Sequence, residues 1–196
     1  MSTNHVDDSQ ELTSRPSGTR RLFYAVRPEP AVLEAIGAVS TRLRKAAQFT
    51  PVSLKWVPRE NLHTTLHFLG SVEEKTVQKL AADLPRAAAG IDPFELEFKG
   101  LGYFPHPKAP RVLWVGVEKP HEGLNALNAT LAELIENHGL TLRHDNFHAH
   151  VTLARFRHLK GSGAFVKLAR EHAQTSFGRS PINEVILMES LLDTTG

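Results

Sequence analysis

The sequence has no cysteine, and this absence excludes disulfide bonds, thiolate metal sites and cysteine nucleophiles together. It also has no apolar run long enough to cross a bilayer, which takes about 20 residues. The N-terminal stretch is mostly polar, carries acidic side chains and lacks the apolar centre of a secretory signal. We therefore expect a cytoplasmic protein that makes no membrane contact.

A strong charge of either sign is absent as well. The formal net charge is +2, and the 11 histidines add positive charge only as the pH falls. Such a small excess permits a polyanionic ligand without favouring one. The 196 residues include 41% apolar and 22% charged side chains, the profile of an ordinary globular protein. The polar stretch 1–19 predicts a disordered tail, and 20–196 predicts a single domain.

Hydrophobic periodicity predicts alternating strands and helices from residue 20 onwards. Short apolar runs and alternating apolar positions predict strands over 20–28, 55–57, 62–69, 94–98, 111–117, 147–156 and 184–192. Apolar residues at helical spacing predict helices over 29–48, 71–88, 122–138 and 162–175. Three prolines predict a loop over 103–110. This order predicts one α+β unit of two similar halves, each with a sheet that helices cover on one face.

One short pattern, His-x-Thr-Leu, occurs twice, as His63-Thr64-Thr65-Leu66 and as His150-Val151-Thr152-Leu153. About 0.1 such matches are expected by chance in a chain of this composition, so chance does not explain the repetition. Because side chains alternate along a strand, His63 and Thr65 share one face, and His150 and Thr152 share another. Each strand therefore presents an imidazole and a hydroxyl on one face and apolar side chains on the other.

These side chains suit acid–base chemistry at phosphorus. A histidine from each of two facing strands can form a pair of one acid and one base near neutral pH. A threonine two residues along, about 7 Å further on the same face, can donate a hydrogen bond without adding charge. The base would activate a nucleophile, the acid would protonate the leaving oxygen, and the two hydroxyls would hold the non-bridging oxygens.

At these residues the sequence resembles the 2H phosphoesterase superfamily, and within it the bacterial RNA 2′,3′-cyclic phosphodiesterases, also called 2′-5′ RNA ligases. The resemblance extends over about 20–192 and is carried by the segments LKWVPRENLHTTLHFLG, YFPHPKAPRVLWVGV and FHAHVTLARF. It implies a bilobal fold with two pseudo-symmetric sheets, helices on their outer faces and a central cleft. It also implies an enzyme that hydrolyses 2′,3′-cyclic phosphates of RNA ends or nucleotides to 2′-phosphomonoesters, with reversible 2′-5′ RNA ligase activity.

The same resemblance implies a metal-free site without a cofactor, for which we expect a monomer, and it assigns roles to individual residues. His63 would be the proton donor and His150 the proton acceptor, and Thr65 and Thr152 would bind the substrate. The arginine of the family's HxTLxR pattern corresponds to Arg155. The remaining motif positions are Thr64, Leu66, Val151 and Leu153.

Three further side chains lie in or next to the motif strands. Simple alternation puts Arg155 on the face opposite His150, so a role for it requires the strand to end or twist first. His67 and His148 are extra imidazoles, and we expect both at the rim of the site.

Two other functions stay open at this point. A metal-dependent phosphohydrolase is suggested by His144, His148 and His150, which can share one side of an extended segment. However, no carboxylate shows clear metal-site spacing, apart from Asp145 on the opposite side. The second alternative is a non-catalytic RNA- or nucleotide-binding module of the same fold, against which the intact motifs argue.

Overall fold

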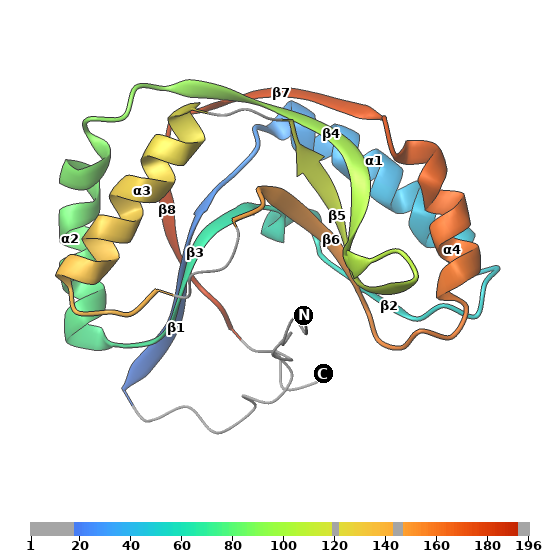
Figure 1. Cartoon of the computed structure of the whole chain (residues 1–196), viewed down its shortest axis with the longest axis horizontal. Coiled ribbons are helices and arrows are strands. Elements are labelled where there is room, and N and C mark those ends of the chain that lie inside the picture. The colour runs from blue at the N-terminus through green and yellow to red at the C-terminus, as the bar shows by residue number, and fades with distance from the viewer. Residues whose placement is uncertain (1–17, 119–121, 143–146, 192–196) are drawn as a thin grey trace, which may run out of the picture.

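The computed structural model describes residues 18–118, 122–142 and 147–191 (Figure 1). Most of the predicted tail, residues 1–17, lies outside the described residues, and the first strand already begins at Thr19. None of the described helices is both long and apolar enough to span a membrane.

The strands form one eight-stranded antiparallel sheet in the order β7-β4-β5-β6-β3-β1-β8, with β2 paired to β6. The strands are β1 (Thr19–Val26), β2 (Leu54–Trp56), β3 (Thr64–Glu73), β4 (Phe94–His106), β5 (Ala109–Val117), β6 (His150–Phe156), β7 (Ser176–Ile182) and β8 (Ile186–Glu189). The helices are α1 (Pro30–Ala47), α2 (Glu74–Ala88), α3 (Glu122–Asn137) and α4 (Ser162–Ala169), with short 3₁₀ turns at 59–61 and 170–172.

The molecule has two lobes that meet between β3 and β6. The first lobe consists of β1, β3 and β8 with α2 and α3, and the second of β2 and β4 to β7 with α1 and α4 (Figure 1). The predicted bilobal α+β architecture is confirmed. The two predicted sheets are joined into one curved sheet by a single residue pair, Thr64 with Val151.

The lobes do not correspond to the two halves of the sequence. The helix α3 and the strand β8 come from the second half but belong to the first lobe, whereas α1 and β2 make the opposite exchange. Each lobe therefore contains segments from both halves of the sequence.

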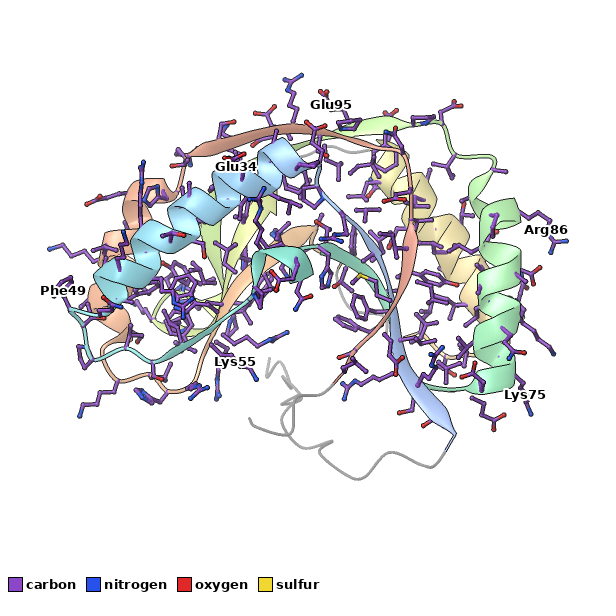
Figure 2. All side chains as sticks on the ribbon, turned by 180° about the vertical axis from the view of Figure 1, so that it is seen from behind. Glu34, Phe49, Lys55, Lys75, Arg86 and Glu95 are labelled. Atoms are coloured by element: carbon purple, nitrogen blue, oxygen red, sulfur yellow. The ribbon has the colours of Figure 1, made fainter. Side chains whose placement is uncertain are left out.

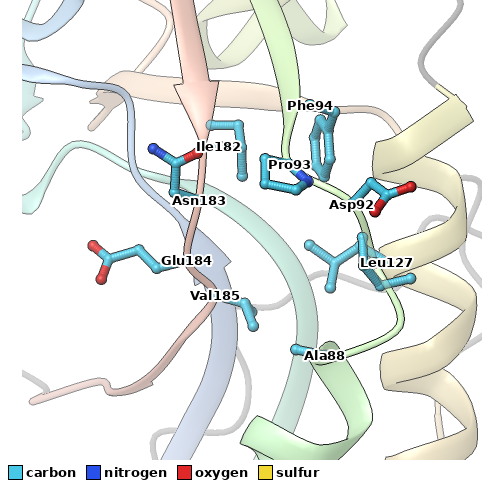
Figure 3. A pocket seen from close by; sticks show the side chains of 10 residues that line it. Ala88, Asp92, Pro93, Phe94, Leu127, Ile182, Asn183, Glu184 and Val185 are labelled. Carbon is cyan, nitrogen blue, oxygen red and sulfur yellow. The ribbon is translucent and has the colours of Figure 1, made fainter.

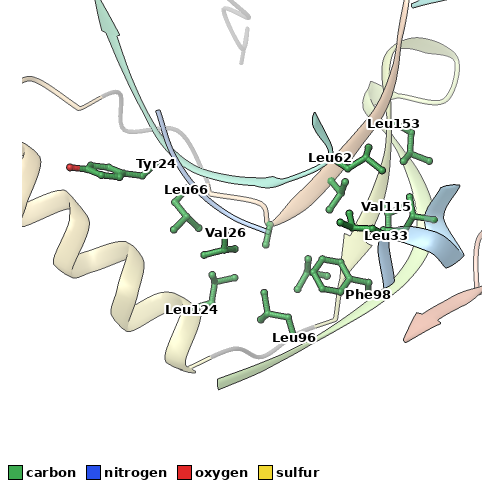
Figure 4. Close-up of a cluster of buried hydrophobic side chains, with 14 of the residues drawn as sticks. Tyr24, Val26, Leu33, Leu62, Leu66, Leu96, Phe98, Val115, Leu124 and Leu153 are labelled. Atoms are coloured by element: carbon green, nitrogen blue, oxygen red, sulfur yellow. The ribbon is translucent and has the colours of Figure 1, made fainter. Parts of the chain in front are cut away.

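Apolar side chains of both lobes form one continuous core (Figure 4). Val32, Ile36 and Leu43 of α1 are almost fully buried, as their helical spacing predicts. Leu66 of the first lobe and Leu153 of the second lie in the same core. Each such side chain stabilises the fold by about 1.5–3 kcal/mol through its burial. The core therefore holds the two histidine motifs at a fixed distance from each other.

The first motif strand is longer than predicted. It continues through Gly70, which has a φ of 70°, and its pairing with β1 extends to Glu73. Val72 is buried in this added part of the strand. The helix α2 consequently begins at Glu74 and not at the predicted residue 71.

The stretch 103–110 is a β-hairpin and not the predicted loop. Strand β4 extends to His106 and β5 begins at Ala109. Pro105 and Pro110 face each other in the pairing, so the two residues without an N–H group share one position of the ladder. The prolines therefore lie where the hairpin approaches its turn and the ladder can lack a hydrogen bond.

The strand β7 has no equivalent among the sequence predictions. Its sequence, SFGRSPI, contains a glycine, a proline and only two large apolar residues, yet it forms the edge of the sheet beside β4. The last helix is shorter than predicted. It ends at Ala169 and not at residue 175, and a 3₁₀ turn connects it to β7, which begins at Ser176.

Candidate active site

The two His-x-Thr-Leu motifs meet across an antiparallel pair. Thr64 lies opposite Val151, and both side chains are fully buried on the core side of the sheet. Their neighbours in each strand therefore point to the other face. Continuing the antiparallel register by one residue places His63 opposite Thr152 and Thr65 opposite His150.

The result is an array of two histidines and two threonines related by a pseudo-twofold axis. We call His63, Thr65, His150 and Thr152 the catalytic array. Neighbouring strands lie about 4.8 Å apart, and residues two positions apart in a strand lie about 7 Å apart. All four side chains are half-buried. The diagonal of the array thus separates the two imidazoles, and each has a threonine hydroxyl beside it. The structure brings together the four residues that the sequence analysis selected.

Both motif leucines interrupt the strand pairing in the same way. In β3, Thr65 and His67 pair with Ala25 and Tyr24, which are adjacent in β1, so Leu66 is an extra residue. In β6, Thr152 and Ala154 pair with the adjacent residues Trp114 and Leu113 of β5, so Leu153 is extra. An extra residue of this kind is a β-bulge, which shifts the alternation of faces by one position.

The bulge in β6 resolves the position of Arg155. Ala154 follows Leu153 onto the core side, where both are fully buried. Arg155 then points to the face of His150, contrary to the simple alternation used in the sequence analysis. Its charge acts on His150, which is consistent with this placement. The corresponding shift in β3 brings Phe68 to the face of His63, and the Phe68 side chain is 64% exposed.

The same shift removes His67 from the site. Its partner across the strands is Tyr24, whose side chain is fully buried in the core. The His67 Nε2 hydrogen-bonds the backbone carbonyl of Asn128 in α3 at 2.8 Å. The prediction that His67 lies at the rim of the site is therefore wrong, because its side chain connects β3 to α3.

Matching hydrogen bonds fix the orientation of the imidazoles of His63 and His150. The Nδ1 of His63 lies 2.7 Å from the carbonyl oxygen of Asn61, and the Nδ1 of His150 lies 2.7 Å from that of His148. A carbonyl oxygen can only accept, so each Nδ1 carries the hydrogen. In the neutral form of each ring, Nε2 is then the nitrogen that can accept a proton.

The surroundings favour the neutral form of both rings. Burial lowers the pKa of His63, the hydrogen bond to Asn61 raises it, and the Arg27 guanidinium lowers it. Burial also lowers the pKa of His150, and its hydrogen bond to the backbone acts in the opposite direction. The positive charges of His148, Arg155 and His63 lower the pKa of His150 further.

Aromatic side chains pack against both imidazoles and were not identified from the sequence. The Phe23 ring stacks on His63 with ring centroids 4.9 Å apart and an interplanar angle of 29°. On the other side of the array, Phe104 meets His150 edge-on, with centroids 4.9 Å apart. Trp114 packs against both Phe104 and His148, with ring centroids 5.0 Å from each. These rings restrict the imidazoles from several sides, and only the pairing of distant strands brings them there.

Trp114 occupies a space that two glycines leave open. A β-carbon on Gly102 would collide with the Trp114 ring, and one on Gly116 would come within 3.2 Å of it. The half-buried His148 ring meets this indole edge-on, with ring centroids 5.0 Å apart. Arg27 is a further site residue that the sequence analysis missed, and it hydrogen-bonds the carbonyl of Glu60 at 2.7 Å.

A metal site is not evident in the described part of the chain. Among the described residues, no group of three or more histidine, aspartate or glutamate side chains could hold a metal ion. His144 and Asp145, which the metal-dependent alternative uses, lie outside the described residues.

A separate pocket lies beside α3, between the end of α2 and the segment after β7 (Figure 3). Its volume is about 70 Å³, well below the roughly 300–1,000 Å³ of typical small-molecule sites. It is lined by Ala88, Ile91, Asp92, Pro93, Phe94, Leu127, Ile182, Asn183, Glu184 and Val185. This pocket is too small for a nucleotide and shares no residue with the catalytic array.

Comparisons with known proteins agree with this geometry. The sequence model of the 2′-5′ RNA ligase superfamily matches residues 26–193. The RNA 2′,3′-cyclic phosphodiesterase of Aeropyrum pernix is 35% identical over 79% of this chain and 87% of its own length. The one from Aquifex aeolicus is 32% identical over 83% of this chain and 86% of its own.

Solved structures share the fold. A crystal structure of a Thermus thermophilus protein matches with a TM-score of 0.73 and 29% identity, over 90% of this chain and 91% of the other. The crystal structure of E. coli LigT in complex with 3′-AMP matches with a TM-score of 0.65 and 24% identity, over 89% of this chain and 90% of the other.

Proposed function

This chain belongs to the 2′-5′ RNA ligase superfamily, and from this membership we propose its function. The chain hydrolyses 2′,3′-cyclic phosphates at RNA ends or on nucleotides to 2′-phosphomonoesters. It uses the two histidines as acid and base and requires no metal. Relatives named RNA 2′,3′-cyclic phosphodiesterases, which match most of the chain, support the substrate class.

The reaction is one in-line displacement at the phosphorus atom. His150 Nε2 takes a proton from water, and the water oxygen forms a bond to phosphorus. The bond from phosphorus to the 3′ oxygen breaks, and that oxygen takes the proton from Nε2 of His63. The phosphate remains on the 2′ oxygen. The assignment of His63 as donor and His150 as acceptor rests on the family resemblance.

The remaining groups of the site stabilise the charge on the phosphate. The hydroxyls of Thr65 and Thr152 donate hydrogen bonds to the non-bridging oxygens, and Arg155 adds a positive charge on the same face. If the 5′-hydroxyl of a second RNA strand takes the place of water, the same displacement forms a 2′-5′ linkage. The ligase reaction therefore needs no further catalytic group.

The catalytic array is the observation that carries this proposal. Two imidazoles, each with its Nδ1 hydrogen held by a carbonyl, lie diagonally across an array that also holds two hydroxyls. One chain supplies the complete array, which supports action as a monomer. A pure binding module would need the hydroxyls and the cation but not two imidazoles with matched tautomers.

The deciding experiment incubates the protein with an RNA oligonucleotide that ends in a 2′,3′-cyclic phosphate, in excess EDTA and without added cation. We expect ring opening to a product that resists a 3′-phosphate-specific phosphatase. A sensitive product would reverse the assigned regiochemistry. Activity that disappears in EDTA and returns with one metal would favour the metal-dependent alternative. The absence of turnover under all conditions would favour the binding module.

A further inference from the structure

Three cations line the far end of the second lobe on the face of the catalytic array. Lys55 of β2 pairs with Arg155 of β6, so the two side chains share a face. The pairing continues one step beyond the strand, where the Arg157 N–H donates to the carbonyl of Ser53 at 3.0 Å. Phe156, between the two arginines, is buried in the core. Arg155 and Arg157 therefore both point away from the core.

We call Lys55, Arg155 and Arg157 the basic ladder. Figure 2 shows Lys55 on the side of the second lobe that faces away from α1. The ladder continues the row that His150 and Thr152 begin on β6. Lys55 lies about 5 Å across the sheet from Arg155, and Arg157 lies about 7 Å further along the strand.

The charges of the basic ladder are not neutralised within the described part of the chain. All three side chains are exposed, and none forms an ion pair with a described carboxylate. Some other cations of the molecule do have such partners: Arg20 contacts Glu189 at 3.3 Å, and Arg179 contacts Glu97 at 3.1 Å. Exposed cations at regular spacing without acidic neighbours attract a ligand with several negative charges.

The two lobes differ in this respect. Phe68 occupies the position in the first motif that Arg155 occupies in the second, and it packs against Phe23, whose ring stacks on His63. The face beside His63 is therefore aromatic at the point where the face beside His150 becomes cationic. A bound polyanion would extend over the second lobe.

We propose that the basic ladder binds the phosphodiester backbone of an RNA strand that leaves the catalytic array on the side of His150. This inference rests on the proposed function, because the array must act on RNA ends. Two kinds of RNA strand have such a backbone at this site: the strand that ends in the cyclic phosphate and, in ligation, the strand that offers a 5′-hydroxyl. Both have neighbouring phosphates at a spacing that extended cations on a strand can follow.

The test uses the double variant Lys55→Gln/Arg157→Gln and leaves Arg155 intact, because Arg155 belongs to the catalytic machinery. The matched control is Arg42→Gln/Lys79→Gln, which removes two exposed cations from the outer helices. One assay compares kcat/KM for a ten-nucleotide RNA with a 2′,3′-cyclic end and for cytidine 2′,3′-cyclic phosphate. A second measures inhibition of cytidine 2′,3′-cyclic phosphate hydrolysis by a ten-nucleotide RNA with a 5′-hydroxyl and no cyclic end.

The ladder variant should keep the wild-type kcat/KM for the mononucleotide, which has no flanking phosphate. It should lose about tenfold in one of the two RNA assays at low salt, and the salt dependence of that assay should weaken by about 0.7 log units per log unit for each cation removed. Loss in the first assay identifies the cyclic-phosphate strand, and loss in the second identifies the 5′-hydroxyl strand.

The inference is overturned if the ladder variant equals the control variant in both assays and in salt dependence. If the wild type hydrolyses neither cyclic phosphate, the proposed function fails instead. Binding of the same two RNAs, followed by fluorescence anisotropy, then still tests the ladder. Equal affinity of wild type and ladder variant would reject it without reference to turnover.

Discussion

Replacing each catalytic histidine in turn tests whether the array acts as one unit. Both imidazoles have Nδ1 held at 2.7 Å from a carbonyl, so each can move one proton, at Nε2. A positioned acid or base contributes about 10²–10⁴ in rate. We therefore expect His63→Ala and His150→Ala each to lower kcat by that factor, or about 3–5 kcal/mol in activation free energy.

The double variant separates one concerted step from two independent effects. If the two histidines acted independently, their losses would multiply to about 10⁴–10⁸. Since both protons move in the same displacement, the double variant should be little slower than the slower single variant. KM should change far less than kcat, because Thr65, Thr152 and Arg155 still hold the phosphate. Initial rates with cytidine 2′,3′-cyclic phosphate give both constants.

Two other histidines serve as controls in this series. His67 binds α3 through the Asn128 carbonyl, so His67→Ala should lower the unfolding temperature and leave the kcat of the folded protein near wild type. His148→Ala should keep most of the turnover and raise the pKa of His150. The two-histidine mechanism is refuted if either control loses as much kcat as His63→Ala, or if a single motif variant keeps nearly full turnover.

Further predictions follow from the pKa shifts. The pH profile of kcat/KM should be bell-shaped. Arg155→Gln should raise the pKa of His150 and so move the acid limb of the profile to higher pH. Arg27→Gln should raise the pKa of His63 and so move the basic limb to higher pH. A shift of the opposite limb in either variant would contradict the assigned roles. Both imidazoles have a lowered pKa, so at acid pH the folded state binds fewer protons than the unfolded chain. The free energy of unfolding should therefore be highest above about pH 6.5 and should fall as the pH drops through the folded pKa values. Between neutral and acid pH, the unfolding temperature of the double variant His63→Ala/His150→Ala should therefore fall less than that of the wild type. In an NMR titration, the His63 ring should protonate at higher pH than the His150 ring, and the reverse order would exchange donor and acceptor.

The sequence was informative wherever a local pattern decides the structure. Helical spacing predicted α1 and α3 closely, and alternation placed the four polar groups of the array on one face. The same alternation rule fails after Leu66 and Leu153, because a bulge depends on how the partner strand pairs and leaves no mark in its own strand. For this reason the facing of His67 and Arg155 could not be predicted.

Residues that reach the site from other strands were hidden for a related reason. Phe23 lies on β1 and Trp114 on β5, far from either motif in the sequence, and only the sheet order brings them to the imidazoles. Arg27 follows β1 and reaches His63 by the same route. The one signal in the sequence is a pair of glycines, Gly102 opposite Trp114 on β4 and Gly116 two residues after it on β5, since residues without a side chain leave room for a large ring.

The pseudo-symmetry of the array leaves open which imidazole donates, and the surroundings break that symmetry. Both rings have the same backbone hydrogen bond and similar burial, so neither of these distinguishes them. The repulsion between the two imidazoles is mutual and does not distinguish them, but His150 also has Arg155 and, when it is protonated, His148 beside it, whereas His63 has the single guanidinium of Arg27. The additional positive charge beside His150 makes a proton on His150 less stable than one on His63. We therefore expect a single proton shared by the pair to reside on His63, which would leave His150 neutral and able to accept. Arg155 and His148, which lie outside the two His-x-Thr-Leu motifs, thus favour the same donor and acceptor as the family resemblance.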